Sequence, residues 1–189
     1  MPTVALPDWP NPALQMPSEA DMNIRPESPK DHAIIRRITA DAFAPMAFSD
    51  GTEADLIHDL RKEGDLILSL VAEEDDTVLG HIAFSPVTIA NRHDGWFGLG
   101  PIAVTPDQQR RGIGTALIAA GLTWLTDHGA KGCVLTGNPK VYGSSGFESD
   151  PALTYRTTPT ENVLRRILSG PAPRGEVRFA PAFERDQGA

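Results

Sequence analysis

"LGPIAVTPDQQRRGIGTALI", residues 99–118, carries the strongest structural signal in this chain. It continues an apolar run from Trp96 to Val104, the pattern of a central β-strand. The polar residues 105–107 end that strand. From Ile113 onward the apolar residues recur at helical spacing, and His128 and Gly129 are expected to end the helix. The stretch therefore predicts a strand, a loop and a long helix.

The loop "QRRGIG", Gln109 to Gly114, places two arginines beside two glycines at the helix entrance. A helix N-terminus offers unpaired N–H groups and a partial positive charge, which together attract phosphate. Glycine removes the Cβ that would hold a ligand away from these amides. The loop therefore favours a diphosphate cradle. The alternative interpretation of the same six residues is an ordinary tight turn into a helix, with the two arginines on the surface.

Two other phosphate-binding loops are excluded by their spacing. A P-loop requires Lys and then Ser or Thr after its second glycine, but Thr115 and Ala116 follow Gly114. A dinucleotide fingerprint requires glycine three residues beyond Gly114, where Leu117 stands.

The rest of the chain predicts a mixed sheet flanked by helices. A polar connection at 73–77 between two β-rich runs indicates an antiparallel hairpin, whereas the later strand, helix and strand suit a parallel crossover. Leu164, Ile167 and Leu168 also suit one helical turn. The expected helices span about 29–43, 52–63 and 113–128, and the expected strands about 23–25, 66–72, 78–84, a run to 90, 96–104, 133–136, 152–157, 161–168 and 176–179.

Two motifs in order resemble one family. Gln109, Gly112 and Gly114 match the Gln/Arg-x-x-Gly-x-Gly/Ala signature of the GNAT superfamily of acyl-coenzyme A-dependent N-acetyltransferases. "GNPKVYGSSGF", residues 137–147, resembles the second strong motif of that family. The resemblance spans residues 22–180, with its specific signals at 95–148.

The resemblance implies an α+β fold of three layers. Its central sheet would be mixed, mostly antiparallel, splayed between two strands and flanked by helices. Residues 22–180 would form a single acetyltransferase domain. Residues 1–21, with five prolines, would be an extended arm, and 181–189 a C-terminal tail.

The resemblance also implies acetyl-coenzyme A as the acyl donor. Strands 96–104 and 132–137 would begin side by side and then separate, and the pantetheine arm would bond there to the backbone of Ile102, Ala103 and Val104, with an amide near Ala103 facing the carbonyl oxygen. The amides of the loop would hold the diphosphate. The cofactor-binding residues expected beyond the strand are Gln109, Arg110, Arg111, Gly112, Ile113, Gly114, Thr115 and Asn138.

Tyr142 matches the tyrosine that in many relatives lies near the coenzyme sulfur and protonates the leaving thiolate. A phenol with a pKa of about 10 holds its proton at neutral pH; a packed loop tyrosine is the alternative. Glu53, at the start of a helix, is the candidate base, although an acidic residue there also favours the helix dipole. His81 in a strand and His58 on a helix surface are weaker candidates. Since no serine elbow occurs, direct attack in a ternary complex is preferred to an acyl-enzyme.

Composition restricts the partners. The formal charge of −8 makes nucleic acid and anionic membranes poor partners, which favours a small-molecule or protein amine as acceptor. No His, Asp or Glu grouping has metal-ligand spacing. Cys133, alone and expected to be buried, fits a reducing cytosol. No apolar run approaches about 20 residues, and residues 1–21 have no Lys or Arg, so we expect a cytoplasmic protein.

Two functions of other classes stay open. One is a non-catalytic coenzyme A-binding regulatory or interaction module. The other is a nucleotide-binding protein that uses the same helix entrance. The sequence also leaves open whether the protein is a monomer or a homodimer.

Overall fold

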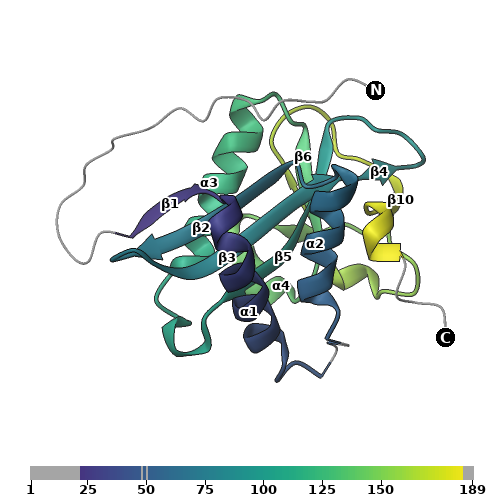
Figure 1. Ribbon diagram of the computed structural model, residues 1–189. Helices are drawn as coiled ribbons and strands as arrows, with labels where there is room; N and C mark the ends of the chain where they lie inside the picture. The colour runs from purple at the N-terminus through teal and green to yellow at the C-terminus, as the bar shows by residue number, and fades with distance from the viewer. Residues whose placement is uncertain (1–21, 48, 50, 185–189) are drawn as a thin grey trace.

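The central sheet of the computed structural model (Figure 1) contains seven strands in the order β1-β2-β3-β5-β6-β9-β7. The structure describes residues 22–47, 49 and 51–184, so the predicted arm at 1–21 lies outside the described residues. A second, three-stranded sheet has the order β4-β10-β8. The strands are β1 (Asn23–Pro26), β2 (Leu68–Glu74), β3 (Thr77–Pro86), β4 (Thr88–Ile89), β5 (Trp96–Val104), β6 (Gly132–Thr136), β7 (Glu148–Ser149), β8 (Leu153–Thr154), β9 (Val163–Ile167) and β10 (Gly175–Arg178).

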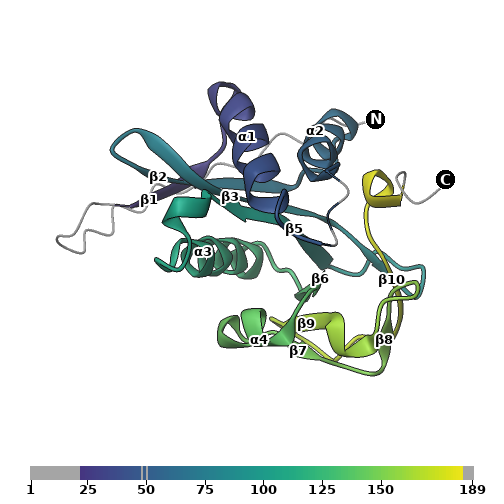
Figure 2. The ribbon, with the colours of Figure 1, turned by 90° about the horizontal axis from the view of Figure 1, so that it is seen from below.

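Helices cover both faces of the large sheet. Figure 2 shows α1 (His32–Phe43) and α2 (Glu53–Glu63) on one side and α3 (Ile113–Asp127) on the other. Each helix turns its apolar stripe inward. This confirms the predicted three-layer α+β class with a mixed, mostly antiparallel sheet. The short helices are η1 (Pro29–Asp31), η2 (Pro106–Gln108), α4 (Pro139–Tyr142), η3 (Gly143–Ser145), η4 (Thr160–Asn162) and η5 (Pro181–Glu184).

The splay between β5 and β6 is present as predicted. The two strands pair in parallel from Trp96↔Gly132 only to Gly98↔Val134, although β5 continues to Val104. On its other side β6 pairs along its whole length with β9. The separation begins at a bulge, where Ala83 of β3 alone lies opposite Gly100 and Pro101 of β5. A bulge bends its strand, and proline has no N–H to offer a neighbour, so β5 turns away from β6 at this point.

Most predicted elements are confirmed, with shifted ends. The hairpin turn contains only Asp75 and Asp76, whose φ angles of 47° and 59° suit a two-residue turn. β2 therefore ends at Glu74 and β3 begins at Thr77, both nearer the turn than predicted, while β2 starts two residues later than predicted. Leu164 and Ile167 lie in a strand, not a helical turn. The sequence interpretation missed β7, α4 and η3.

The C-terminal segment packs against α2. Residues 181–184, which we expected to begin a tail, form η5, and buried Ala182 joins Leu60 of α2 in one apolar cluster. The described fold therefore continues through Glu184. Cys133 is buried in β6 as predicted, and burial raises the pKa of its thiol.

Candidate functional site

The entrance of α3 exposes unpaired amides. Its N-cap is Gly112, in the left-handed region at φ 83°, and no side chain caps the helix. The first helical bond runs from the N–H of Ala116 to the carbonyl of Gly112 (2.9 Å), which leaves the amides of Ile113, Gly114 and Thr115 outside the helical ladder. A Cβ added at Gly112 would meet nothing within 4 Å. The entrance therefore combines open space, N–H donors and the positive end of a 15-residue helix.

The side chains of the loop tie it to its neighbours. Gln109 donates through Nε2 to the carbonyl of Val104 (3.2 Å) and so fastens the loop to the end of β5. Arg111 lies 3.4 Å from the carboxylate of Glu74 and therefore points toward the β2–β3 hairpin. Arg110 is exposed, in the left-handed region at φ 65°.

On the side of β5 that β6 has left, only every second residue of β5 presents its backbone N–H and C=O groups. Thr105 donates its N–H to the carbonyl of Leu79, directly opposite on the β3 side (2.8 Å). Backbone groups of an antiparallel pair alternate between facing the partner and facing away, so Ala103 faces β3 while Ile102 and Val104 face the side that β6 has left. The bond from Gln109 to Val104 agrees with this alternation. Ile102 and Val104, on either side of Ala103, are therefore the residues of β5 whose N–H groups face the open side.

Tyr142 ends the short helix α4 and is partly buried. Its ring meets Phe147 edge-on, with centroids 6.3 Å apart, and lies so close to Gly137 that a Cβ there would come within 2.6 Å of the tyrosine Cε2. Burial raises the pKa of its phenol, so the hydroxyl keeps its proton at neutral pH. Gly137 makes room for this ring and was not among the predicted residues, although it stands in the second motif.

The other predicted residues lie at helix ends. Asn138 is the N-cap of α4, and its Oδ1 accepts from the N–H of Lys140 (2.9 Å). Glu53 is in the first turn of α2 and accepts a hydrogen bond from Ser49 (2.9 Å). Both side chains thus form hydrogen bonds at the start of a helix, whatever their part in the predicted site.

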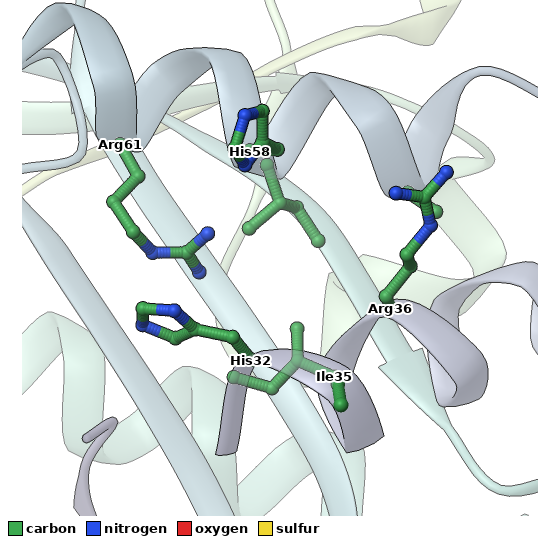
Figure 3. Close-up of a pocket in the computed structure, with 8 residues that line it drawn as sticks. His32, Ile35, Arg36, His58 and Arg61 are labelled. Atoms are coloured by element: carbon green, nitrogen blue, oxygen red, sulfur yellow. The ribbon is translucent and has the colours of Figure 1, made fainter. Parts of the chain in front are cut away.

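A pocket of about 410 Å³ runs along α3 from the entrance of this helix. Thr115, at the helix entrance, and Ile118 line one wall, while Ser144, Ser145 and Arg166 line the other. A smaller pocket of about 200 Å³ lies between α1 and α2, on the opposite face of the sheet. Figure 3 shows His32, Arg36, His58 and Arg61 around this second pocket, above the apolar Ile35.

The two histidines that the sequence analysis named as weaker candidate bases, His58 and His81, lie in different environments. His58 is exposed on α2, as predicted, whereas His81 is completely buried in β3, as expected for a core imidazole. Within residues 22–47, 49 and 51–184, no group of three or more His, Cys, Asp or Glu side chains is placed to hold a metal ion. In that same part of the chain, no helix is long and apolar enough to cross a membrane.

Comparison with known proteins gives one consistent result. The model of the acetyltransferase (GNAT) family matches residues 33–147. YhbS of Escherichia coli K12, an uncharacterized N-acetyltransferase, is 38% identical over 128 residues, which are 67% of this chain and 74% of YhbS.

Two solved structures are similar over most of their length. A GNAT family acetyltransferase from Brucella melitensis in complex with acetyl-CoA has 42% identity and a TM-score of 0.78, covering 87% of this chain and 99% of that one. The Escherichia coli YhbS structure in complex with CoA has 31% identity and a TM-score of 0.79, covering 91% and 97%. The strand with an open edge, the uncapped helix entrance and these similarities lead to one conclusion: the chain belongs to the GNAT family of acetyltransferases.

Proposed function

We propose that this acetyltransferase moves an acetyl group from acetyl-coenzyme A to the primary amine of a small molecule or a protein by direct attack in a ternary complex. The observation that carries the proposal is the open backbone edge at Ile102 and Val104, followed at once by the uncapped entrance of α3. The similar structures bound to acetyl-CoA and CoA support the donor.

The residues fit this donor by their chemistry. The amides of Ile113, Gly114 and Thr115 would hold the diphosphate, with Arg110 and Arg111 adding positive charge at the rim. The pantetheine arm would add to the edge of β5 like another strand. The pocket along α3 begins at Thr115 and would take the nucleotide end, and the amide group of Asn138 would contact the coenzyme from α4.

When bound, acetyl-coenzyme A supplies the thioester whose carbonyl carbon the amine attacks. The outward N–H of Ile102 or Val104 would donate to the carbonyl oxygen as negative charge develops on it. Tyr142 would donate its proton to the departing thiolate, and Glu53 would take a proton from the acceptor amine. Cys133, the single cysteine of the chain, is fully buried, and this burial favours direct attack over a cysteine acyl-enzyme.

The test begins at the cradle. Gly112→Asp places bulk and negative charge against the phosphates, so acetyl-coenzyme A affinity measured by calorimetry should fall at least about tenfold, or about 1.4 kcal/mol. Gly129→Asp is the matched control, because Gly129 is also in the left-handed region with nothing within 4 Å, but at the other end of α3. Equal affinities in the two variants would contradict the cradle.

Turnover separates the enzyme from the non-catalytic module. With a panel of primary amines, the wild-type chain should release coenzyme A steadily, and Tyr142→Phe should lose on the order of 100-fold in kcat while it retains acetyl-coenzyme A affinity. Binding without turnover across the panel would instead favour the coenzyme A-binding module. Competition by ATP equal to that by coenzyme A would favour a nucleotide-binding protein.

A further inference from the structure

Arg166 of β9 is an arginine whose charge has no carboxylate beside it. The partly buried arginines of the described chain are Arg25, Arg61, Arg165 and Arg166. The first three each form an ion pair with a carboxylate, whereas Arg166 forms none with any described residue. A partly buried charge without a counter-charge is costly, so this position favours the binding of an anion.

The side chain of Arg166 points toward α3. Arg166 pairs directly with Cys133 of β6, and directly opposed residues of two neighbouring strands project from the same face of a sheet. Cys133 belongs to the apolar cluster beneath α3. Arg166 Nη1 donates to the backbone carbonyl of Ser145 at the end of η3, and residues of α3 form the facing wall of the pocket that Arg166 lines. The guanidinium therefore lies between α3 and η3.

The backbone at Gly146 makes room for this guanidinium. Gly146 is in the left-handed region, at φ 78°, and a Cβ added there would clash with the guanidinium of Arg166. A guanidinium has five N–H donors, and the bond to Ser145 is the only hydrogen bond that the described residues provide to Arg166. The remaining donors can bind an anion through two parallel hydrogen bonds.

The pocket that Arg166 lines is the larger one, which begins at the entrance of α3. Thr115, whose amide lies outside the helical ladder, lines one end of it, and Ser144 and Ser145 line it beside Arg166. Asp127, the last residue of α3, is the acidic residue of the lining; it is exposed and forms no ion pair with Arg166. The wall formed by η3 and β9 thus offers a positive charge and two hydroxyl-bearing residues.

The coenzyme has one further anionic group that suits this wall. Coenzyme A carries a diphosphate on the 5′ carbon of its ribose and a phosphate on the 3′ carbon of the same ribose. The diphosphate is already assigned to the amides of Ile113, Gly114 and Thr115. Because both groups are attached to one sugar, the 3′-phosphate would enter the pocket next to Thr115. A phosphate monoester carries between one and two negative charges at neutral pH, and the planar fork of an arginine matches two of its oxygens.

We propose that Arg166, together with Ser144, binds the 3′-phosphate of the coenzyme, so that the protein selects coenzyme A over 3′-dephospho-coenzyme A. The inference rests on the proposed acetyl-coenzyme A site. The 3′-phosphate takes no part in acetyl transfer and is remote from the thioester, so its contacts stabilise the bound substrate and the transition state equally. Loss of these contacts should therefore raise KM and leave kcat unchanged.

Calorimetry with coenzyme A and 3′-dephospho-coenzyme A tests the assignment, because the two ligands differ only in this phosphate. The wild-type chain should bind coenzyme A at least about 30-fold more tightly, as expected for hydrogen bonds between charged groups. In Arg166→Gln, the affinity for coenzyme A should fall until the two ligands differ by less than about threefold. The affinity for 3′-dephospho-coenzyme A should not change, which also shows that the variant is folded.

Arg110→Gln is the matched control. Arg110 lies at the rim of the proposed diphosphate site, and both ligands carry the diphosphate. This variant should therefore weaken both ligands by the same factor and keep the wild-type preference. If the wild-type chain binds both ligands equally, or if Arg166→Gln weakens both equally, the role of Arg166 in binding the 3′-phosphate is overturned.

Turnover separates this assignment from the proposed function. With one amine and the acetylated forms of both ligands, the wild-type chain should show a KM at least about tenfold lower for acetyl-coenzyme A at the same kcat. Equal KM values with steady turnover overturn the role of Arg166 while the acetyltransferase stands. The binding preference without turnover supports the role of Arg166 in a coenzyme A-binding module and contradicts catalysis. A wild-type chain that binds neither ligand overturns both proposals.

Discussion

Tyr142 depends on a residue without a side chain for its position. Gly137, which follows β6, leaves room for the tyrosine ring, and Asn138 then caps the helix that ends in Tyr142. The ring is further held by its edge-on contact with Phe147. Three residues of one motif thus fix the orientation of the proposed proton donor.

Gly137→Ala should therefore reduce activity without unfolding the protein. The added Cβ would lie 2.6 Å from Tyr142 Cε2, so the ring must move, and kcat should fall about tenfold, which corresponds to about 1.4 kcal/mol in the barrier. Gly143→Ala is the control, because a Cβ there meets nothing within 4 Å and its backbone is helical. Similar kcat values in both variants would show that the ring position is unimportant.

The sequence predicts the environment of a residue well where its immediate neighbours in the chain determine that environment. The uncapped helix entrance at Gly112 was predictable because a helix N-terminus exposes its first amides whatever surrounds it. His81 was predicted only as a weaker candidate base, and its hydrogen-bond partners were not predicted. A chain of hydrogen bonds joins Glu27, Ser69 and His81 from three separate segments, and no spacing in the sequence reveals the register that brings them together.

At the scale of the element, α3 packs against the sheet through two glycines in different ways. Gly121 lies against the ring of Phe84, where an added Cβ would come within 2.3 Å. At Gly114 an added Cβ would meet Ile102 and Val104 only at 3.8 and 3.9 Å, which is ordinary contact. The middle of α3 therefore requires glycine for close packing, whereas its start does not.

Gly121→Ala should destabilise the fold by about 1–3 kcal/mol, because overpacking against Phe84 outweighs the better helix propensity of alanine. Gly114→Ala, in the same helix, should cost no stability. Urea unfolding of both variants measures the difference. A Gly121→Ala protein as stable as Gly114→Ala would mean that α3 shifts away from the sheet at no cost.

Elements with a clear period were predicted well, and short ones were not. The β5 run has an apolar pattern with a polar stop, and its predicted ends, 96 and 104, match the structure. The four-residue α4 and the two-residue β7 are too short to show any period, and their positions depend on contacts with Phe147 and β9. The splay was expected only through the family resemblance, since a bulge depends on pairing between strands.

At the scale of the whole molecule, the two faces of the sheet carry different groups of residues. Figure 2 shows α3 on one face and α1 and α2 on the other. The larger pocket lies along α3, and Glu27, Ser69 and His81 form a chain of hydrogen bonds on the α1–α2 side. β5 connects the two faces: its backbone borders the open edge, and Ala103 packs beneath α1. This arrangement depends on the order of the strands in the sheet, in which β5 lies between β3 and β6. That order depends on the complete fold and cannot be read from a single segment of the sequence.

The buried imidazole should make global stability depend on pH. His81 has a pKa of about 4 in the folded chain against 6.5 for an exposed histidine. As the pH falls from 6.5 to 4, the unfolded chain binds a proton that the folded chain does not, so the free energy of unfolding should decrease by about 3 kcal/mol. The pKa of Asp31 is held well below its usual range by Arg25, so its contribution is lost only at lower pH.

Chemical unfolding of the wild-type chain and His81→Gln at pH values from about 7 to about 4 isolates this contribution, because the other titrating groups are common to both proteins. The difference between their free energies of unfolding should shrink by about 3 kcal/mol toward pH 4, since glutamine binds no proton in either state. Parallel curves would mean that the pKa of His81 is the same in the folded and the unfolded chain. If the wild-type chain instead becomes more stable relative to His81→Gln toward pH 4, the folded chain holds the imidazole as a cation beside Glu27.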